Sequence, residues 1–368
     1  MTDVGGYLDS ASSEPLHPAA RDTLLAALDR GYADARRLHK PARDARLLLD
    51  NARAVVAECL EVRADEVSFT SSGTSAVHLG LLGLARALRR VGSGIVHSEV
   101  EHSAVRHAAT WGGVPHLLGA DSEGRVSPDH LVETSTAPDV AVCALQSANH
   151  EVGTVQRVEE LRLPPDVPLF VDACASMGRL PLPQGWAALA GSAHKWGGPA
   201  GVGILLVRRG VRWENPVPEY DRFDHRTGGF ENVPAALAAA AALQAVLAER
   251  EETNARQHAM IDRIRSVAAR LPDTEVVGDP VLRLPHLVTF SCLYVNGEAL
   301  VTELDRRGFS VASGSACTAS TLEPSHVLAA MGALTHGNVR VSLTRETSDE
   351  QVDAFCAALP DVVAGLRG

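Results

Sequence analysis

Three short segments of the sequence combine residue types that could bind an anion, a charged ring nitrogen and a carbonyl carbon. Residues 69–75, Phe-Thr-Ser-Ser-Gly-Thr-Ser, let backbone N–H groups and a hydroxyl approach an anion where a helix begins. Asp172 ends an apolar run, the position at which ligands of α/β sheets bind. Lys195 precedes a glycine-rich run, and a desolvated lysine forms Schiff bases with carbonyl compounds. Together these segments predict a site for pyridoxal phosphate.

Each of these segments alone also has an ordinary structural interpretation. Residues 69–75 could be a serine-rich turn with a helix cap, and Asp172 could cap the next turn. A lysine such as Lys195 is a surface residue by default. The order of all three along one chain, each beside an expected strand, favours the cofactor site over these separate interpretations.

Cys317 differs from the other five cysteines in its surroundings. It lies in Ser-Gly-Ser-Ala-Cys-Thr-Ala-Ser, residues 313–320, a small and polar segment, whereas the others stand among apolar neighbours. An ionised thiol in such a segment can act as a nucleophile, while the others are expected to be small core residues. No Cys-x-x-Cys pair occurs, and no metal site is predicted. The other five are Cys59, Cys143, Cys174, Cys292 and Cys356.

Composition places the chain among ordinary globular proteins. Of its 368 residues, 45% are hydrophobic and 21% are charged, which excludes a disordered or fibrous chain. The net charge of -11 argues against a nucleic-acid or anionic-membrane surface. The first residues lack the basic and apolar regions of a signal peptide, and the alanine-rich stretch 234–247 is too short to span a membrane. We expect a cytoplasmic protein with no membrane partner and no direct nucleic-acid partner.

Short apolar runs alternate with longer amphipathic stretches between about residues 67 and 207. This is the pattern of a mostly parallel sheet wrapped by helices, and the strands are apolar enough to be covered on both faces. The predicted fold class is therefore α/β. We expect strands at 67–70, 94–98, 140–145, 169–172 and 203–207, and helices that include 43–60 and 75–89.

A second region follows a long helical stretch at 233–271. Its strands and helices are spaced as in a smaller α+β unit. The expected strands lie near 274–277, 287–292, 309–312 and 338–343, with helices at 298–307 and 349–366. We predict a large cofactor-binding domain over residues 16–245 and a small domain formed by residues 1–15 and 246–368, which carries the Cys317 loop.

The whole chain resembles the cysteine desulfurases of the class V aminotransferase family. The segment around Cys317, followed by Leu-Glu-Pro-Ser at 322–325, is similar to the catalytic loop of the subgroup in which that loop is long. The resemblance implies the fold-type I architecture of pyridoxal-phosphate-dependent transferases. The other matching segments are residues 7–11, 101–102, 171–173, 192–195 and 338–343.

The resemblance also implies which residues bind pyridoxal 5'-phosphate. A lysine would hold the cofactor covalently, an aspartate would keep its ring nitrogen protonated, and a histidine would stack on its ring. Backbone and side-chain donors from two segments would bind the phosphate. The implied cofactor-binding residues are Lys195, Asp172, His102, Gly73, Thr74, Ser192, His194 and Asn149.

The implied reaction converts L-cysteine to L-alanine. Arg340 would bind the substrate carboxylate, with Asn149 as a second substrate contact, and Lys195 would move the proton at Cα. His102 is the nearest candidate for proton transfer at the substrate thiol. Cys317, as a thiolate, would take the sulfur as a persulfide and pass it to a sulfur-accepting protein. By the same resemblance, the chain is expected to form a homodimer.

Three positions depart from the family's pattern. Ala175 stands where a glutamine would contact the phenolic oxygen of the cofactor, and His150 stands where a second asparagine is expected. Residues 219–230 replace a stretch whose threonine would reach the phosphate of the partner subunit. These changes touch the surroundings of the cofactor rather than the fold. They leave the rate, the affinity for the cofactor and the substrate preference open.

Two other functions are compatible with the same residues. One is a pyridoxal-phosphate-dependent lyase that cleaves C–S or C–Se bonds of another amino acid, whose turnover a Cys317→Ser change would spare. The other is a non-catalytic scaffold with this fold, suggested by Ala175 and His150. The desulfurase is favoured because a scaffold needs neither Lys195 nor Arg340. The sulfur acceptor stays open among iron–sulfur assembly, tRNA thiolation, DNA sulfur modification and thio-natural-product pathways.

Overall fold

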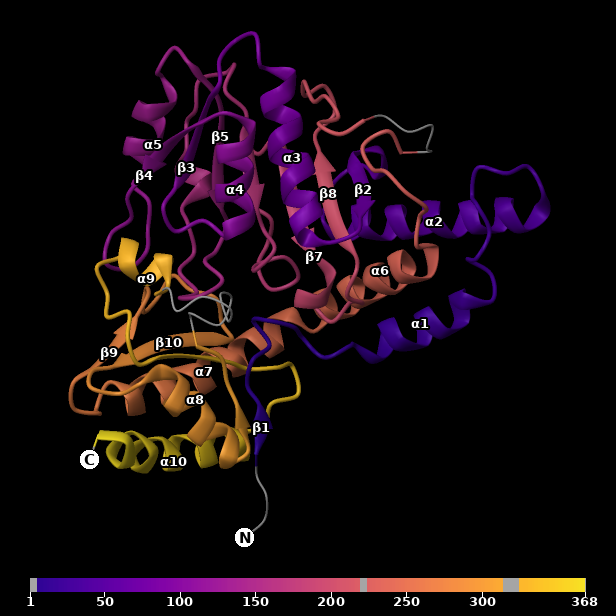
Figure 1. The fold of residues 1–368 in the computed structure, drawn as a ribbon. Helices are drawn as coiled ribbons and strands as arrows, with labels where there is room; N and C mark the ends of the chain where they lie inside the picture. The colour runs from indigo at the N-terminus through magenta and orange to yellow at the C-terminus, as the bar shows by residue number, and fades with distance from the viewer. Residues whose placement is uncertain (1–4, 219–223, 314–323, 368) are drawn as a thin grey trace.

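The computed structural model describes residues 5–218, 224–313 and 324–367, and its larger part is built on a seven-stranded sheet (Figure 1). The strand order is β2-β8-β7-β6-β5-β3-β4. β8 runs antiparallel to both of its neighbours, and the other strands share one direction. This confirms the predicted α/β class with a mostly parallel sheet. The strands are β2 (Val67–Thr70), β3 (Gly94–Ser98), β4 (Val114–Leu118), β5 (Val140–Gln146), β6 (Leu169–Asp172), β7 (Ala188–Ser192) and β8 (Gly203–Val207).

Helices cover both faces of this sheet (Figure 1). One face carries α3 and α4, and the other carries α1, α2 and α6, which pack on one another. Short 3-10 turns lie at Ala64–Glu66, Val158–Glu160 and Ala193–Lys195. The helices of this part are α1 (Pro18–Leu28), α2 (Lys40–Cys59), α3 (Gly73–Ala87), α4 (Ser103–Gly112), α5 (Pro128–Ser135) and α6 (Val233–Ala248).

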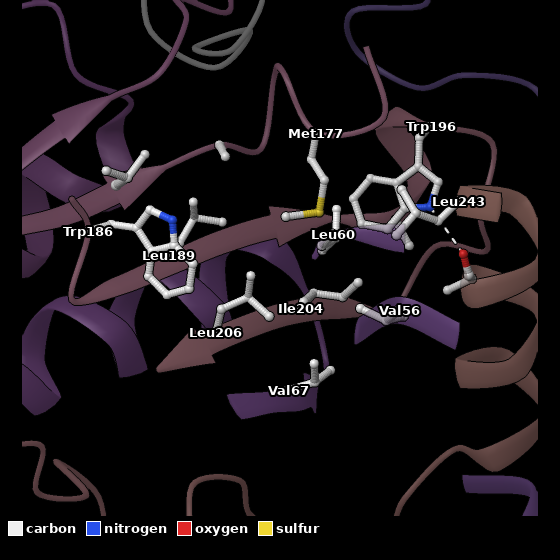
Figure 2. Packing of buried hydrophobic residues seen from close by; sticks show 14 of the residues in the cluster. Val56, Leu60, Val67, Met177, Trp186, Leu189, Trp196, Ile204, Leu206 and Leu243 are labelled. Atoms are coloured by element: carbon white, nitrogen blue, oxygen red, sulfur yellow. Dashed lines mark hydrogen bonds between the residues drawn. The ribbon is translucent and has the colours of Figure 1, made fainter. Parts of the chain in front are cut away.

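The side chains of β8 show how the two layers divide. Leu205 packs in the cluster under α3, whereas Ile204 and Leu206 point into the opposite cluster (Figure 2). In that second cluster the Trp196 indole donates a 3.2 Å hydrogen bond to the Ala239 carbonyl of α6. Since successive residues of a strand point to opposite faces, an entirely apolar strand is what a sheet covered on both sides requires.

The sequence pattern does not predict β4 and β7. β4 lies at the edge of the sheet and contains Pro115 and His116, so no apolar run marks it. β7 reads Ala-Leu-Ala-Gly-Ser, which contains few residues that favour strands. It is buried between β6 and β8 and contacts α3. Tertiary packing therefore places β7 where local preference does not.

The smaller part contains a three-stranded antiparallel sheet in the order β12-β10-β9, with its own apolar core. The N-terminal segment belongs to it, because β1 pairs with β11 and Leu8 is buried in that core. The domain boundaries at residues 15/16 and 245/246 stay a prediction. The elements are β1 (Gly6–Tyr7), α7 (Arg250–Ala268), β9 (Thr274–Val277), β10 (Leu287–Cys292), α8 (Gly297–Arg306), β11 (Phe309–Ser310), α9 (His326–Ala330), β12 (Asn338–Ser342) and α10 (Asp349–Arg367).

The long helical stretch expected at 233–271 is two helices. α6 ends and α7 begins around Glu249, and the two are bent by 70° relative to each other. Among the described residues, no single helix has the length and apolar character needed to cross a membrane, although this bent pair meets the test when it is taken together.

Candidate active site

A cavity of about 290 Å³ lies at the carboxyl ends of β5, β6 and β7, the edge at which α/β sheets bind ligands. Gln146, Asp172 and Ser192, the last residues of these three strands, all line it. The cavity brings together most of the site residues predicted from the sequence. Those that line it are Gly73, Thr74, His102, Asp172, Ser192, His194, Lys195 and Arg340.

The N-terminus of α3 forms one end of the cavity. Ser72 caps this helix, and its hydroxyl accepts a 3.0 Å hydrogen bond from the Ser75 amide. Gly73 is required by close approach, because a Cβ atom here would lie 2.6 Å from Ser192 Cβ. Ser192 Oγ in turn lies 3.1 Å from His194 Nδ1. Backbone amides, a hydroxyl and an imidazole thus converge at a helix N-terminus, which is a site suited to a phosphate.

Lys195 lies on the 3-10 turn that follows β7, and its side chain reaches into the cavity. Its ammonium donates a 2.6 Å hydrogen bond to the Ala11 carbonyl, which belongs to the N-terminal segment. This bond links the two parts of the molecule at the reactive amine.

Asp172 is 6% exposed at the end of β6. One of its carboxylate oxygens accepts a 2.9 Å hydrogen bond from the Cys174 amide. The capping role considered as an alternative is therefore present, and the carboxylate lines the cavity as well. One side chain can serve both purposes because a carboxylate accepts several hydrogen bonds.

His102 also combines a structural and a site position. It is the N-cap of α4, where Nδ1 accepts a 3.1 Å hydrogen bond from the Ala104 amide, and its ring lines the cavity. Burial lowers the pKa of His102 below its ordinary value, although the negative charge of Asp172 opposes this. The imidazole is therefore neutral at pH 7, and because Nδ1 accepts from the Ala104 amide, the ring proton lies on Nε2.

Glu101, next to His102, lies outside the cavity lining and is fully buried. One carboxylate oxygen accepts hydrogen bonds of 2.9 Å from the Ser98 hydroxyl and from the Gln146 amide, so this side chain ties the end of β3 to the end of β5. Burial raises its pKa to about 8, with a further contribution from Asp172. The carboxyl is thus held protonated at neutral pH and adds no full negative charge beside Asp172.

Arg340 enters the cavity from β12 of the smaller part. Its Nη2 donates to the Asp9 carboxylate at 2.8 Å and to the Ser12 hydroxyl at 2.7 Å, and Nη1 donates to the His150 carbonyl at 3.1 Å. The buried Nε has no partner among the described residues. The guanidinium lines the cavity and can bind an incoming carboxylate through its N–H groups when the carboxylate displaces Asp9.

Asn149 does not reach the cavity. Its side-chain oxygen accepts hydrogen bonds from the Glu151 and Val152 amides at 2.8 and 2.9 Å, and its amide nitrogen donates to the Val100 carbonyl at 3.0 Å. It is fully buried and holds the turn after β5 in shape. The geometry therefore does not support Asn149 as a contact of cofactor or substrate, and that assignment stays a prediction.

Two residues that the sequence did not assign line the cavity instead. Cys174, expected to be an ordinary core residue, lies beside Asp172 and borders the cavity. Burial, followed by the charge of Asp172, raises the pKa of the Cys174 thiol well above its ordinary value, so it is not a thiolate near pH 7. His150 borders the cavity as well, and only its departure from the family's pattern marked it in the sequence.

The residues present fit pyridoxal phosphate. Gly73 leaves room for backbone amides to approach a phosphate, and Ser192 and His194 add donors at the same point. Asp172 and Lys195 lie in the same cavity, where they could hold the ring nitrogen and the aldehyde carbon. Among the described residues, no cluster of histidine, cysteine and acidic side chains could hold a metal ion.

Comparison with known proteins assigns the chain to a family, because the model of the aminotransferase class-V family matches residues 6–355. The chain belongs to this family. It is 35% identical over 381 residues to the IscS-like cysteine desulfurase of Mycobacterium tuberculosis, covering 98% of this chain and 97% of the relative. It is 32% identical over 382 residues to the cysteine desulfurase NifS of Azotobacter vinelandii, covering 100% and 94%. The predicted resemblance to cysteine desulfurases is thus confirmed.

Solved structures support the fold of this class V aminotransferase family member. A NifS-like protein superposes with a TM-score of 0.89 at 24% identity, covering 98% of this chain and all of the other. DndA from Streptomyces lividans superposes with a TM-score of 0.77 at 27% identity, covering 92% and 99%. The expected fold-type I architecture is therefore confirmed. Cys317, the expected sulfur acceptor, lies outside the described residues.

Proposed function

We propose that this protein is a pyridoxal-phosphate-dependent cysteine desulfurase that converts L-cysteine to L-alanine and holds the sulfur as a persulfide on Cys317. The observation that carries the proposal is the meeting of Lys195, Asp172 and Arg340 in one cavity, in a chain whose relatives are named cysteine desulfurases. These residues come from three separate strands or turns. Their convergence supplies a group for the aldehyde, one for the ring nitrogen and one for the substrate carboxylate.

The cofactor side of the reaction depends on the large-domain residues. Bound pyridoxal phosphate supplies an electron sink for bonds broken around the substrate Cα. Asp172 would hold the proton on the ring nitrogen, since its buried carboxylate favours a cation next to it. Gly73, Ser192 and His194 would bind the phosphate. Lys195 would take up the Cα proton of the substrate.

The substrate side depends on Arg340, His102 and Cys317. Arg340 would orient the carboxylate of L-cysteine by exchanging its ion pair with Asp9 for one with the substrate. Neutral His102, with its proton on Nε2, is the nearest candidate for proton transfer at the substrate thiol. The Cys317 thiolate then attacks the substrate sulfur. A sulfur–sulfur bond forms and the carbon–sulfur bond breaks, and the electron pair left on carbon takes up a proton to give the methyl group of L-alanine.

Mass spectrometry tests this proposal directly. The protein loaded with pyridoxal phosphate is incubated with L-cysteine, and both the protein and the amino acids are analysed. We expect Cys317 to gain the mass of one sulfur atom and L-alanine to appear, and we expect Cys317→Ser to lose both. Release of pyruvate or another product with undiminished turnover in Cys317→Ser would support a lyase, and no turnover with L-cysteine would overturn the proposal.

The sequence contains two lysines, which makes the covalent site simple to locate. Lys40 is exposed on α2 and pairs with Asp44 at 2.7 Å, whereas Lys195 lines the cavity. Borohydride reduction of the loaded protein should fix the cofactor to Lys195 and leave Lys40 unmodified. Peptide mapping distinguishes the two, and label on Lys40 alone would contradict the site.

We also propose that the protein acts as a homodimer in the cytoplasm and passes its sulfur to an acceptor protein. The support is the relationship to the desulfurase family and the net charge of -11, which does not favour nucleic acid or anionic membranes. Light scattering of the purified protein tests the oligomeric state. A monomer that still forms the Cys317 persulfide would refute the dimer and leave the desulfurase proposal standing.

A further inference from the structure

His150 is a buried side chain whose imidazole forms no hydrogen bond with the part of the chain that the structure describes. The residue is 8% exposed, and its Nε2 lies 3.6 Å from a Glu151 carboxylate oxygen, which is too long for a hydrogen bond. Within the described residues, no hydrogen bond of the imidazole ring is found, whereas its backbone carbonyl accepts from Arg340. Buried polar groups in folded proteins nearly always have a partner. The ring of His150 lines the cavity, so its partner is to be sought there.

A second, smaller cavity defines where His150 stands relative to Lys195. This space of about 10 Å³ is adjacent to the main cavity, and it is large enough for about one water molecule. Four residues line both cavities, namely Ala11, His150, Ala175 and Lys195. Of these four, only His150 and Lys195 carry polar side-chain atoms. His150 and Lys195 are therefore the polar side chains common to the two cavities, whereas Ser10, Arg179 and His286 line the small one alone.

On the other side of Lys195 lie the residues expected to bind the phosphate. Ser192 and His194 line the main cavity next to the N-terminus of α3 and do not line the small one. In pyridoxal phosphate, the carbon bound by the lysine lies between the phosphate-bearing arm and the phenolic oxygen. With the phosphate arm directed to Ser192, the phenolic oxygen is directed to the His150 side.

Ala175 borders the same junction and offers no side-chain donor. A glutamine is expected at this position from the resemblance to the family, and the alanine removes its amide. The space beside Ala175 is large enough for about one water molecule. Among the side chains that line both cavities, His150 is the one besides Lys195 that can replace its hydrogen bond, because a neutral imidazole has one N–H donor.

We propose that His150 donates a hydrogen bond to the phenolic oxygen of the cofactor and thereby controls how tightly the nitrogen of Lys195, in its bond to the cofactor, holds a proton. The inference rests on the proposed function, because it requires pyridoxal phosphate on Lys195. It assigns a role to a residue at which this chain departs from its family.

The groups around His150 keep its ring neutral and therefore able to serve as one donor. His102 from α4 lies edge-on at 4.9 Å between ring centroids, with an angle of 72° between the ring planes. Lys195, Arg340 from β12 and His326 from α9 are the other basic groups near it, and Glu151 is the adjacent acid. Burial, followed by these basic neighbours, places the pKa of His150 well below its ordinary value.

The absorption spectrum of the loaded protein tests the proposal independently of turnover. The visible band changes as the nitrogen of Lys195 loses its proton, so a pH titration gives a midpoint. This proton is shared between the nitrogen and the phenolic oxygen of the cofactor. A hydrogen-bond donor to the oxygen stabilises its negative charge, so the shared proton is lost at a lower pH. We expect His150→Phe, which keeps a ring but no donor, to raise the midpoint by about one pH unit. An unchanged or lowered midpoint overturns the proposal.

Two further variants sharpen this test. His107→Phe, at an exposed histidine on α4, should leave the midpoint unchanged. His150→Asn with Ala175→Gln restores the side chains expected from the family and should return the midpoint to within about 0.3 units of the original. If this double variant stays as far shifted as His150→Asn alone, the assigned contact is wrong. Absence of any visible band in the original protein, together with no persulfide on Cys317, refutes the proposed function instead.

Discussion

The two walls of the cavity are held in place in different ways. The wall from the larger part consists of Gly73, Asp172 and Ser192, each at the end of a strand or the start of a helix, and the side chains of Asp172 and Ser192 form hydrogen bonds with residues two positions away. The opposite wall depends on Arg340, which is positioned by Asp9, far away in the sequence. On the cofactor side these hydrogen bonds are local and the sheet brings Gly73 to Ser192, whereas the contact of Arg340 with Asp9 joins opposite ends of the chain.

This difference separates two functions that the walls should perform independently. A change on the large-domain wall should alter cofactor binding first. A change on the opposite wall should alter the affinity for L-cysteine and leave the bound cofactor as it is. Variants on each wall can therefore establish whether the division is real.

The largest effect is expected from Lys195→Ala on the large-domain wall. Removing the amine takes away both the covalent hold on the cofactor and the group that moves the Cα proton, so turnover of L-cysteine should fall by about a thousandfold or more. The visible band of the bound cofactor should disappear as well. Lys40→Ala is the matched control, because it removes the other lysine of the chain from an exposed helix. A Lys195→Ala protein that keeps the band and the activity would rule out this wall as the reaction site.

Arg340→Ala on the opposite wall should act on the substrate alone. Loss of a charge-assisted pair with the carboxylate should raise KM for L-cysteine by about a hundredfold, while the visible band and its intensity stay unchanged. Steady-state kinetics and the absorption spectrum measure the two effects separately. Arg283→Ala serves as the control, since Arg283 is a buried arginine of the smaller part that pairs with Asp262 and lies outside the cavity lining. If Arg340→Ala also abolished the band, the two walls would not be separable.

The same difference explains what could be predicted from the sequence. β2, β3 and β6 were predicted with their observed bounds, because apolar runs and flanking polar residues are local signals. Lys195 was predictable as a site residue from the glycine-rich run that follows it, although β7, the strand before it, was not. The ion pair of Arg340 with Asp9 was not, because nothing local in either segment specifies the other. Such a pair becomes visible only when β12 and the N-terminal segment lie side by side.

Asn149 is a second residue whose place in the structure could not be predicted from the sequence. The resemblance to the family suggested a polar contact in the site, but neighbouring amides occupy its side chain. Asparagine side chains compete for local backbone groups in turns, and the turn after β5 uses this one. His150, the next residue, takes the position in the cavity instead. A sequence pattern places the pair near the site, and only the folded backbone decides which of the two enters it.

Gly73→Ala should produce an intermediate effect confined to the cofactor. The added Cβ would approach Ser192 Cβ to 2.6 Å, so either the helix start or the Ser192 segment must shift. We expect the dissociation constant for pyridoxal phosphate to rise about tenfold, with a loss of about 1–3 kcal/mol in the free energy of unfolding of the cofactor-free protein. Gly365→Ala is the matched helical control, because a Cβ there meets open space. Unchanged cofactor affinity in Gly73→Ala would mean that the phosphate binds elsewhere.

The smallest effect, a change in Tm with pH, is expected from the protonation of His102, which lines the cavity. Burial lowers its pKa, so in cofactor-free protein its NMR titration midpoint should lie below about 6.5, with His102→Gln providing the assignment. Below about pH 6.5 the unfolded chain binds a proton on His102 that the folded protein does not bind. The free energy of unfolding therefore falls as the pH drops. His150 and His286 contribute in the same direction, so His102→Gln should reduce the loss of Tm between pH 6.5 and 5 without abolishing it. A midpoint above 6.5 would show that Asp172 outweighs burial and that the imidazole enters the reaction already charged.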